Sequence, residues 1–275
     1  MQEENITTYK GFRVDDTAEW HLTVYISEKG MSAYLKNVEN PLEQIVTLFS
    51  ESWKTDERSL LDNIENAVYD HPQLLDDFST DIVVAAPRCL WIPAEIADGR
   101  EELAAEYRKI YPSSEDDIFF DAVGDMRCVY SLASGLPSFM RRTLSGARIR
   151  SQQGLLVSRF MENVADMPRL YVNIRQDEAD MLLFDGKKLL LASTHPWREQ
   201  TDLLYNVLNI MEVYKLDSEN TMVSLSGLKE VKTEFMKELR KYVTYVMLTT
   251  LPSGFSKSDI PLGAALVMSR LSQRS

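Results

Sequence analysis

Four arginines that lie close together in the sequence are the clearest candidates for contact with an anion. Arg141, Arg142, Arg148 and Arg150 flank the stretch Leu144-Ser145-Gly146, and guanidinium groups bind phosphate through paired hydrogen bonds. Arginine is also common at helix ends and in ion pairs. The pattern leaves two interpretations open, an anion-binding patch or a solvated, salt-bridged face, and we favour the second.

Other residues that could hold a metal or act as nucleophiles form no recognisable arrangement. Glu115, Asp116 and Asp117 are consecutive rather than convergent, which is typical of a solvated loop. Cys89 and Cys128 fit no metal-ligand spacing and lie among apolar neighbours. The three histidines stand apart in the sequence, and each is interpreted as a turn or strand-end residue. We therefore nominate no catalytic residue and no metal ligand.

The net charge narrows the classes of partner. The chain has 30 Lys+Arg against 42 Asp+Glu, a formal net charge of −12. Phosphate backbones and anionic membrane surfaces would be repelled by this charge. The sequence therefore predicts an acidic protein that binds no nucleic acid.

The sequence also carries no recognisable targeting or membrane segment. Residues 1–5 lack the basic and apolar regions of a secretory signal. The longest apolar stretch, residues 242–251, is far shorter than the roughly 20 residues that a membrane-spanning helix needs. We expect a cytoplasmic protein without membrane insertion.

Length and composition indicate two globular domains. The chain has 275 residues, of which 44% are hydrophobic and 26% charged, as in ordinary globular proteins. This length exceeds the usual size of a single core. Asp166-Met167-Pro168 has the composition of a boundary, so the predicted domains are residues 1–166 and 167–275.

Hydrophobic periodicity assigns α/β elements to both halves. In the first half it predicts strands at 22–26, 31–35, 82–86 and 128–133, and helices at 56–69, 101–110, 136–144 and 152–164, with a further helix entered at Pro93. In the second half it predicts strands at 170–174, 181–184, 189–192, 222–225 and 244–248, and helices at 197–216, 228–242 and 262–271. A third strand of the first half is placed within residues 41–49, where periodicity does not separate a strand from a short helix.

The order of elements in the two halves indicates a duplication. Leu22 matches Leu170 in the opening strand, Ile82 matches Met222 in the central strand, and residues 136–138 match residues 251–253. Each copy reads β-β-β-α-β-α-β-α. A repeated unit of this kind predicts two similar α/β domains.

This duplicated order resembles the actin-like ATPase fold, in which two ribonuclease-H-like domains enclose a nucleotide. Residues 82–87 with 91–96 are similar to a strand-Pro-helix segment of chaperone-type members, and residues 223–227 to their strand-Gly-helix adenosine segment. The chain looks like a member of an uncharacterised Bacteroidetes domain-of-unknown-function family with this fold. That resemblance implies a fold and no established activity.

The resemblance implies a carboxylate and a glycine near the end of the first strand of each domain, which would organise Mg²⁺ and phosphate. The first copy has Ser27-Glu28-Lys29-Gly30 there, and the second has residues 173–178 without any glycine. Lys29 with Gly30, and Ser226 with Gly227, could still hold a nucleotide loosely, or could serve only as turn and helix-entry residues. ATP and Mg²⁺ are thus not supported by motifs, and no cofactor is expected.

A two-metal nuclease on this fold would need an acid within the first strand. Residues 22–26 contain none, although Asp76, Asp77 and Asp81 lie before the expected fourth strand. We therefore expect no nuclease activity.

Preserved architecture with altered catalytic positions favours a non-catalytic scaffold, or a weak nucleotide binder, that acts through an unidentified protein partner. The alternative is a divergent Mg-dependent ATPase or small-molecule kinase that recruits its metal through Glu28 or Asp177. A ligand-binding sensor would have the same sequence features as a scaffold.

Overall fold

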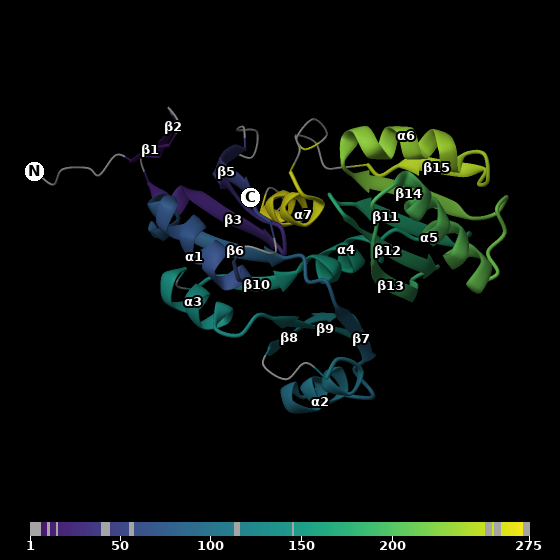
Figure 1. Cartoon of the computed structure of the whole chain (residues 1–275), viewed down its shortest axis with the longest axis horizontal. Helices are drawn as coiled ribbons and strands as arrows, with labels where there is room; N and C mark the ends of the chain where they lie inside the picture. Colours follow the sequence, from purple (N-terminus) through teal and green to yellow (C-terminus); the bar gives the residue numbers. More distant parts are fainter. Residues whose placement is uncertain are drawn as a thin grey trace, which may run out of the picture. The chain divides into compact units, whose positions relative to one another are not determined.

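The computed structural model describes residues 7–9, 12–14, 16–39, 45–54, 58–112, 116–144, 146–250, 255 and 260–271 (Figure 1). The chain divides into two compact units. One contains the described residues up to Gln152 together with those from Gly263 onward, and the other contains Gln153–Leu262. A short hairpin of β1 (Thr7–Tyr9) and β2 (Phe12–Val14) precedes the first unit's main sheet.

The first unit is built on a five-stranded sheet in the order β10-β6-β3-β4-β5. Its strands are β3 (Trp20–Ser27), β4 (Gly30–Asn37), β5 (Val46–Ser52), β6 (Ser79–Val84) and β10 (Arg148–Ser151). The first three form an antiparallel meander, and β6 and β10 continue the sheet parallel to β3. The third element, predicted within residues 41–49, is therefore a strand, β5, and not a short helix. Residues 41–44 lie outside the described residues.

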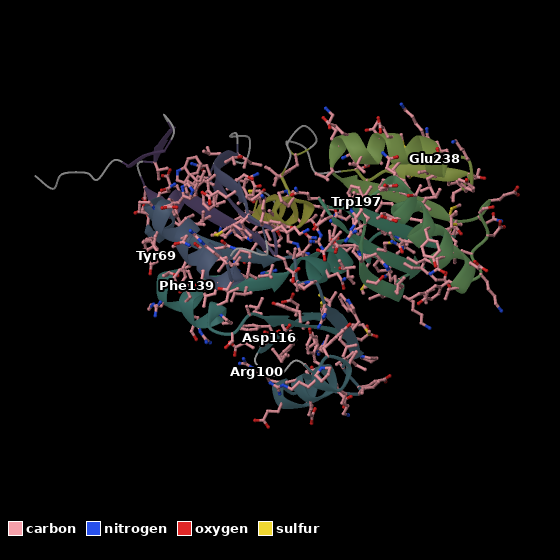
Figure 2. The ribbon with its side chains drawn as sticks, in the orientation of Figure 1. Tyr69, Arg100, Asp116, Phe139, Trp197 and Glu238 are labelled. Atoms are coloured by element: carbon pink, nitrogen blue, oxygen red, sulfur yellow. The ribbon has the colours of Figure 1, made fainter. Side chains whose placement is uncertain are left out.

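Helices α1 (Leu60–Asp70) and α3 (Leu136–Thr143) cover one face of this sheet. Ser59 accepts the backbone N–H of Asp62 and so begins α1, and Pro72 prevents its continuation. Tyr69 of α1 meets Phe139 of α3 edge to face, with ring centroids 6.3 Å apart (Figure 2). The same core contains the alternate apolar residues of β3 and β6.

A smaller sheet of order β7-β9-β8 is inserted between β6 and α3. It consists of β7 (Cys89–Pro93), β8 (Asp117–Val123) and β9 (Met126–Leu132), with α2 (Arg100–Ile110) packed against it. The predicted helix at Pro93 is wrong, because Pro93 is the last residue of β7 and a strand end tolerates the missing N–H. The loop predicted at 115–117 is also wrong at Asp117, which begins β8.

The second unit repeats the main sheet of the first in the order β13-β12-β11-β14-β15. Its strands are β11 (Arg169–Ile174), β12 (Glu178–Asp185), β13 (Lys188–Pro196), β14 (Met222–Gly227) and β15 (Tyr245–Leu248). Helices α5 (Gln200–Val213) and α6 (Lys229–Leu239) bury one face of this sheet. Because strand order and directions match those of the first unit, the predicted duplication is confirmed.

The match predicted between residues 136–138 and 251–253 does not follow the duplication. In the first unit the fifth strand is β10, which the sequence prediction omitted, and α3 precedes it. Residues 251–253 come after the fifth strand of the second unit and lie outside the described residues. β10 is short and its alternation of arginines with Ile149 hides its strand character.

The last helix of each copy belongs to the other unit. Helix α4 (Gln152–Phe160) follows β10 but lies with the second unit from Gln153 onward, and α7 (Leu262–Leu271) follows β15 but lies with the first unit from Gly263 onward. The Phe160 ring stacks on Tyr171 with centroids 3.9 Å apart. The boundary expected at 166/167 therefore falls inside the second unit, beyond α4.

Gly227 ends β14 at a position that only glycine fits. Its φ is +93°, and a Cβ there would lie 1.9 Å from the Ile174 carbonyl oxygen. Gly186, in the predicted turn between β12 and β13, has a φ of +56° but no atom within 4 Å of such a Cβ. Both glycines have a left-handed backbone, but only at Gly227 would a Cβ also collide with neighbouring atoms.

We expect Gly227→Ala to lower the free energy of unfolding by about 3–5 kcal/mol, because backbone atoms of β11 must move. Gly186→Ala, the matched control, should cost only about 1–2 kcal/mol for the left-handed conformation. Urea unfolding of both variants measures the difference. Equal losses would show that the approach to Ile174 carries no extra cost.

Candidate functional site

The hairpin that opens each main sheet has the same anchoring in both units. The carbonyl of Ile26 accepts the N–H of Ala85 at 2.8 Å, and the carbonyl of Ile174 accepts the N–H of Leu228 at 2.9 Å. Each donor is the residue that follows the unit's fourth strand, so Ile26 and Ile174 are equivalent. This equivalence identifies matching positions in the two hairpins. The resemblance to actin-like proteins implies that phosphate groups would bind at these hairpins.

A tryptophan after the third strand fixes each hairpin turn. Trp53 donates its backbone N–H to the Lys29 carbonyl at 3.0 Å and its indole N–H to the Glu28 carbonyl at 2.8 Å. Trp197, labelled in Figure 2, donates its backbone N–H to the Asp177 carbonyl at 2.9 Å and its indole N–H to the Arg175 carbonyl at 3.0 Å. Sequence reasoning missed this pair, although each Trp directly follows its third strand.

Of the four residues predicted to hold a nucleotide, Lys29 and Gly30 lie in the first of these turns. Lys29 is exposed, and its carbonyl is held by Trp53. Gly30 begins β4, where a Cβ would lie 2.5 Å from the Glu51 carbonyl oxygen. Packing against β5 is thus sufficient to require glycine at this position.

The other two predicted residues, Ser226 and Gly227, end β14 in the second unit. The Ser226 side chain is buried, and its hydroxyl donates to Asn173 Oδ1 at 3.1 Å. Gly227 is required by its contact with Ile174. The structure therefore brings Ser226 and Gly227 together with the end of β11.

Ser226 belongs to a row of polar side chains that crosses four strands. Backbone pairing sets Thr194, Asp180, Asn173 and Ser226 side by side on β13, β12, β11 and β14. Asn173 Nδ2 donates to Asp180 Oδ2 at 3.0 Å, and the Thr194 hydroxyl donates to Asp180 Oδ1 at 2.9 Å. Gln153 of α4 donates to Thr194 at 3.1 Å. The carboxylate of Asp180, only 2% exposed, is the centre of this row.

Arg175 closes the hairpin end of the row. Its guanidinium lies 3.2 Å from Asp180 Oδ1 and 2.8 Å from Glu178 Oε2. Its backbone N–H donates to the Glu178 carbonyl at 2.8 Å across the two-residue turn Gln176-Asp177, and its side chain reaches β12 through the two ion pairs. Residues 173–178, where the resemblance implies a glycine, thus carry a cation whose side chain is only 12% exposed.

The first unit has different chemistry at the equivalent row. Tyr25 pairs with Ser32 of β4 and Val83 of β6, and the Tyr34 hydroxyl donates to Ser32 at 3.0 Å. Neither β3 nor β11 contains an aspartate or glutamate. At this row the first strands thus carry Tyr25 and Asn173, and neither is a carboxylate.

A second charged cluster spans three strands of the first unit. Asp81, 2% exposed, lies within β6, not before it as predicted, and is 3.1 Å from His21, 2.8 Å from Arg148 and 3.4 Å from Arg150. Burial alone would raise the pKa of Asp81, but His21 and the two arginines outweigh it and hold that pKa below its ordinary value. Arg148 and Arg150 of the predicted anion patch therefore form a salt-bridged face.

Asp121 of β8 holds Ser151, the last residue of β10. Its carboxylate accepts the backbone N–H of Ser151 at 2.7 Å and the Ser151 hydroxyl at 2.6 Å, and Cys128 Sγ lies 3.4 Å from that hydroxyl. Burial raises the pKa of Asp121 and outweighs the Ser151 hydrogen bonds and the charge of Arg150, which act in the opposite direction. Asp121 therefore ties β8 to the end of β10, and this contact is invisible in the sequence.

All three histidines have side-chain partners, so their isolation in the sequence did not predict their surroundings. His21 faces Asp81. His71 lies 2.6 Å from Glu51 and stacks on Phe49, with ring centroids 3.9 Å apart. Burial lowers the pKa of His195, which lies 2.8 Å from the Ser193 hydroxyl. Within the described residues no three His, Cys, Asp or Glu side chains converge as metal ligands.

Comparisons with known proteins agree with this architecture. The sequence profile of the family described as "Protein of unknown function (DUF3822)" matches residues 9–246. A Bacteroides thetaiotaomicron protein with an actin-like ATPase fold and unknown function is 20% identical, with 91% of this chain and 96% of that one covered and a TM-score of 0.78. A chain of the PilM-PilN type IV pilus biogenesis complex is 14% identical, with 94% and 99% covered and a TM-score of 0.55.

These likenesses confirm the predicted actin-like fold of two ribonuclease-H-like domains. A comparison with curated proteins gives no match. Every helix in the described ranges is too short or too polar to cross a bilayer. The comparisons therefore establish an architecture and leave the chemistry to the residues of this chain.

Asp121→Asn tests the half-buried carboxylate that holds Ser151. Because the folded-state pKa of Asp121 lies above its unfolded value, folded protein holds this proton to higher pH than unfolded protein does. The contribution of Asp121 to stability is therefore present below the unfolded pKa, about 3.9, and is lost as the pH rises through the folded pKa. Each unit of difference in pKa is worth about 1.4 kcal/mol.

We expect the stability of Asp121→Asn relative to the wild type to increase between pH 4 and pH 7, as measured by urea unfolding at several pH values. Asp117→Asn, on the exposed end of the same strand, is the control and should show no such trend. Parallel pH profiles of the wild type and Asp121→Asn would contradict the burial of this charge.

Proposed function

This chain belongs to the DUF3822 family of proteins of unknown function, and we propose that it is a non-catalytic scaffold, or a weak nucleotide binder, that acts through a protein partner. The fold is that of ATPases, while the residues at the two hairpins differ from what nucleotide chemistry requires. We therefore propose that the two-domain architecture is retained as a scaffold and that the protein acts by binding a partner on its exposed surface.

The observation that carries the proposal is the closed hairpin of the second unit. Mg²⁺ is bound through carboxylate oxygens that can also reach water and substrate phosphate. Here Asp180 is buried and engaged by Asn173, Thr194 and Arg175. The residues present do not fit a metal-bound nucleotide at this hairpin, which supports a function without ATP turnover.

Two further observations support a protein partner. A protein of the same fold is part of the PilM-PilN complex, so this architecture is compatible with partner binding. On this chain, Tyr245, Met247 and Leu248 of the edge strand β15 are each about 45% exposed, with Tyr242 nearby in sequence at 49%. Tyrosine and methionine are enriched at protein interfaces.

The competing function is a Mg-dependent ATPase or small-molecule kinase that recruits its metal through Glu28 or Asp177. Glu28 is exposed and Asp177 is half-buried, and each lies in a two-residue turn held by a tryptophan. This competing function predicts ATP turnover, and it predicts that Glu28→Gln or Asp177→Asn abolishes that turnover.

Thermal unfolding with Mg²⁺-ATP, ADP or AMP tests the proposal. A ligand at one hundred times its Kd stabilises the native state by about 2.7 kcal/mol, which would raise the unfolding midpoint of a chain of this size by roughly 5–10 °C. We expect a shift of less than about 2 °C at millimolar nucleotide, and no phosphate release. A full shift with turnover lost in Glu28→Gln or Asp177→Asn would replace the scaffold by the ATPase, whereas Lys229→Ala, outside both hairpins, serves as the control.

A further inference from the structure

We propose that the guanidinium of Arg175 is a built-in counter-ion that occupies a divalent-cation position in the second unit. The proposal concerns the chemistry of this hairpin and does not depend on a protein partner. It predicts that the second unit folds without metal, and that loss of the arginine charge converts the same oxygens into a metal site.

The oxygens around Arg175 have the composition that a hard cation prefers. Asp180 and Glu178 project from the same face of β12, and Arg175 bridges their carboxylates at 3.2 and 2.8 Å. The Thr194 hydroxyl contacts the same Asp180 oxygen at 2.9 Å. Two carboxylates and a hydroxyl, completed by water, form a donor set suited to Mg²⁺ or Mn²⁺.

Burial makes a cation necessary at this place. The side chain of Asp180 is 2% exposed and that of Glu178 20% exposed. Two neighbouring carboxylates with little access to water repel each other, and removing the partner of a buried charge is strongly destabilising. An internal arginine satisfies this requirement at every physiological pH, because the guanidinium does not lose its proton.

The backbone of the hairpin directs Arg175 into the cluster. The Arg175 backbone N–H donates to the Glu178 backbone carbonyl at 2.8 Å, and the Arg175 carbonyl accepts the Trp197 indole N–H at 3.0 Å. Both bonds hold the residue at the base of the turn, and the side chain is only 12% exposed. The equivalent turn residue of the first unit is Ser27, and its strand carries Ser32 where β12 carries Asp180. The second unit thus has both the cation and the carboxylate, Arg175 and Asp180, whereas the first unit has serine at both equivalent positions.

Arg175→Gln tests this assignment, because glutamine keeps polarity and removes the charge. We expect the wild type to have the same unfolding midpoint in EDTA and in 5 mM MnCl₂. Any Mn²⁺ that the wild type binds should be bound equally by Asp180→Asn. We expect Arg175→Gln to unfold at least 5 °C lower in EDTA, to recover at least half of that loss in MnCl₂, and to bind one Mn²⁺ by electron paramagnetic resonance titration.

Two controls separate a metal site from general stabilisation by salt. Arg175→Gln combined with Asp180→Asn should lose both Mn²⁺ binding and recovery. Arg148→Gln removes a cation from buried Asp81, but His21 and Arg150 remain there, so Mn²⁺ should give no recovery. Arg175→Lys, which retains a positive charge, should fold and stay indifferent to metal.

The proposal is overturned if Arg175→Gln shows no Mn²⁺ response, if it fails to fold even with Mn²⁺, or if the wild type binds Mn²⁺ through Asp180. These outcomes differ from failure of the scaffold function. A nucleotide-induced shift that persists in Asp180→Asn would overturn the scaffold alone, and an unresponsive Arg175→Gln with no nucleotide binding would overturn the counter-ion alone.

Discussion

The architecture depends on one constraint, that a five-stranded sheet with two buried faces needs helices on both. One face is covered by α1 and α3 in the first unit and by α5 and α6 in the second. The opposite face is covered by the last helix of the other repeat, since α7 lies with the first unit and α4 with the second. Gly263 permits the close approach of α7 to Val83, where a Cβ would lie 2.9 Å from its methyl carbon, and the Phe160 ring covers Tyr171. A cut between the two sequence repeats would therefore leave each sheet without the helix that completes its core.

Much of this fold follows from the sequence, because local hydrophobic periodicity and turn residues depend on neighbours along the chain. The hairpin around Gly30, the helix ended by Pro72 and the turn at Gly186 are examples of features that local chemistry decides. The inserted sheet was read less well, since Pro93 is equally compatible with a helix start and a strand end. The exchange of the last helices, α4 and α7, has no local signal in the sequence, because it is decided by which sheet face each helix covers.

The chemistry of the hairpins was harder to predict for the same physical reason. That Lys29, Gly30, Ser226 and Gly227 stand near turns is visible in the sequence, but what they contact depends on strand register, and a one-residue change of register moves every side chain to the other face. Asp180 meets Asn173 and Thr194 only because three strands align at that residue. His21 and Asp81 likewise meet across β3 and β6, although they are distant in sequence. Sequence patterns identified the positions, and register decided their partners.

Each of the three carboxylates that lie away from the surface, Asp81, Asp180 and Asp121, has its own set of hydrogen-bond or ion-pair partners. Asp81 is surrounded by His21, Arg148 and Arg150, Asp180 by Arg175 and neutral donors, and Asp121 by the amide and hydroxyl of Ser151. In an ATPase such interior carboxylates would have to stay available to a metal ion and its water. Here each has partners from its own unit, and these partners also tie strands and helices together. The same interactions that stabilise the two sheets thus engage these carboxylates, and on this ground we propose a function that uses the exposed surface.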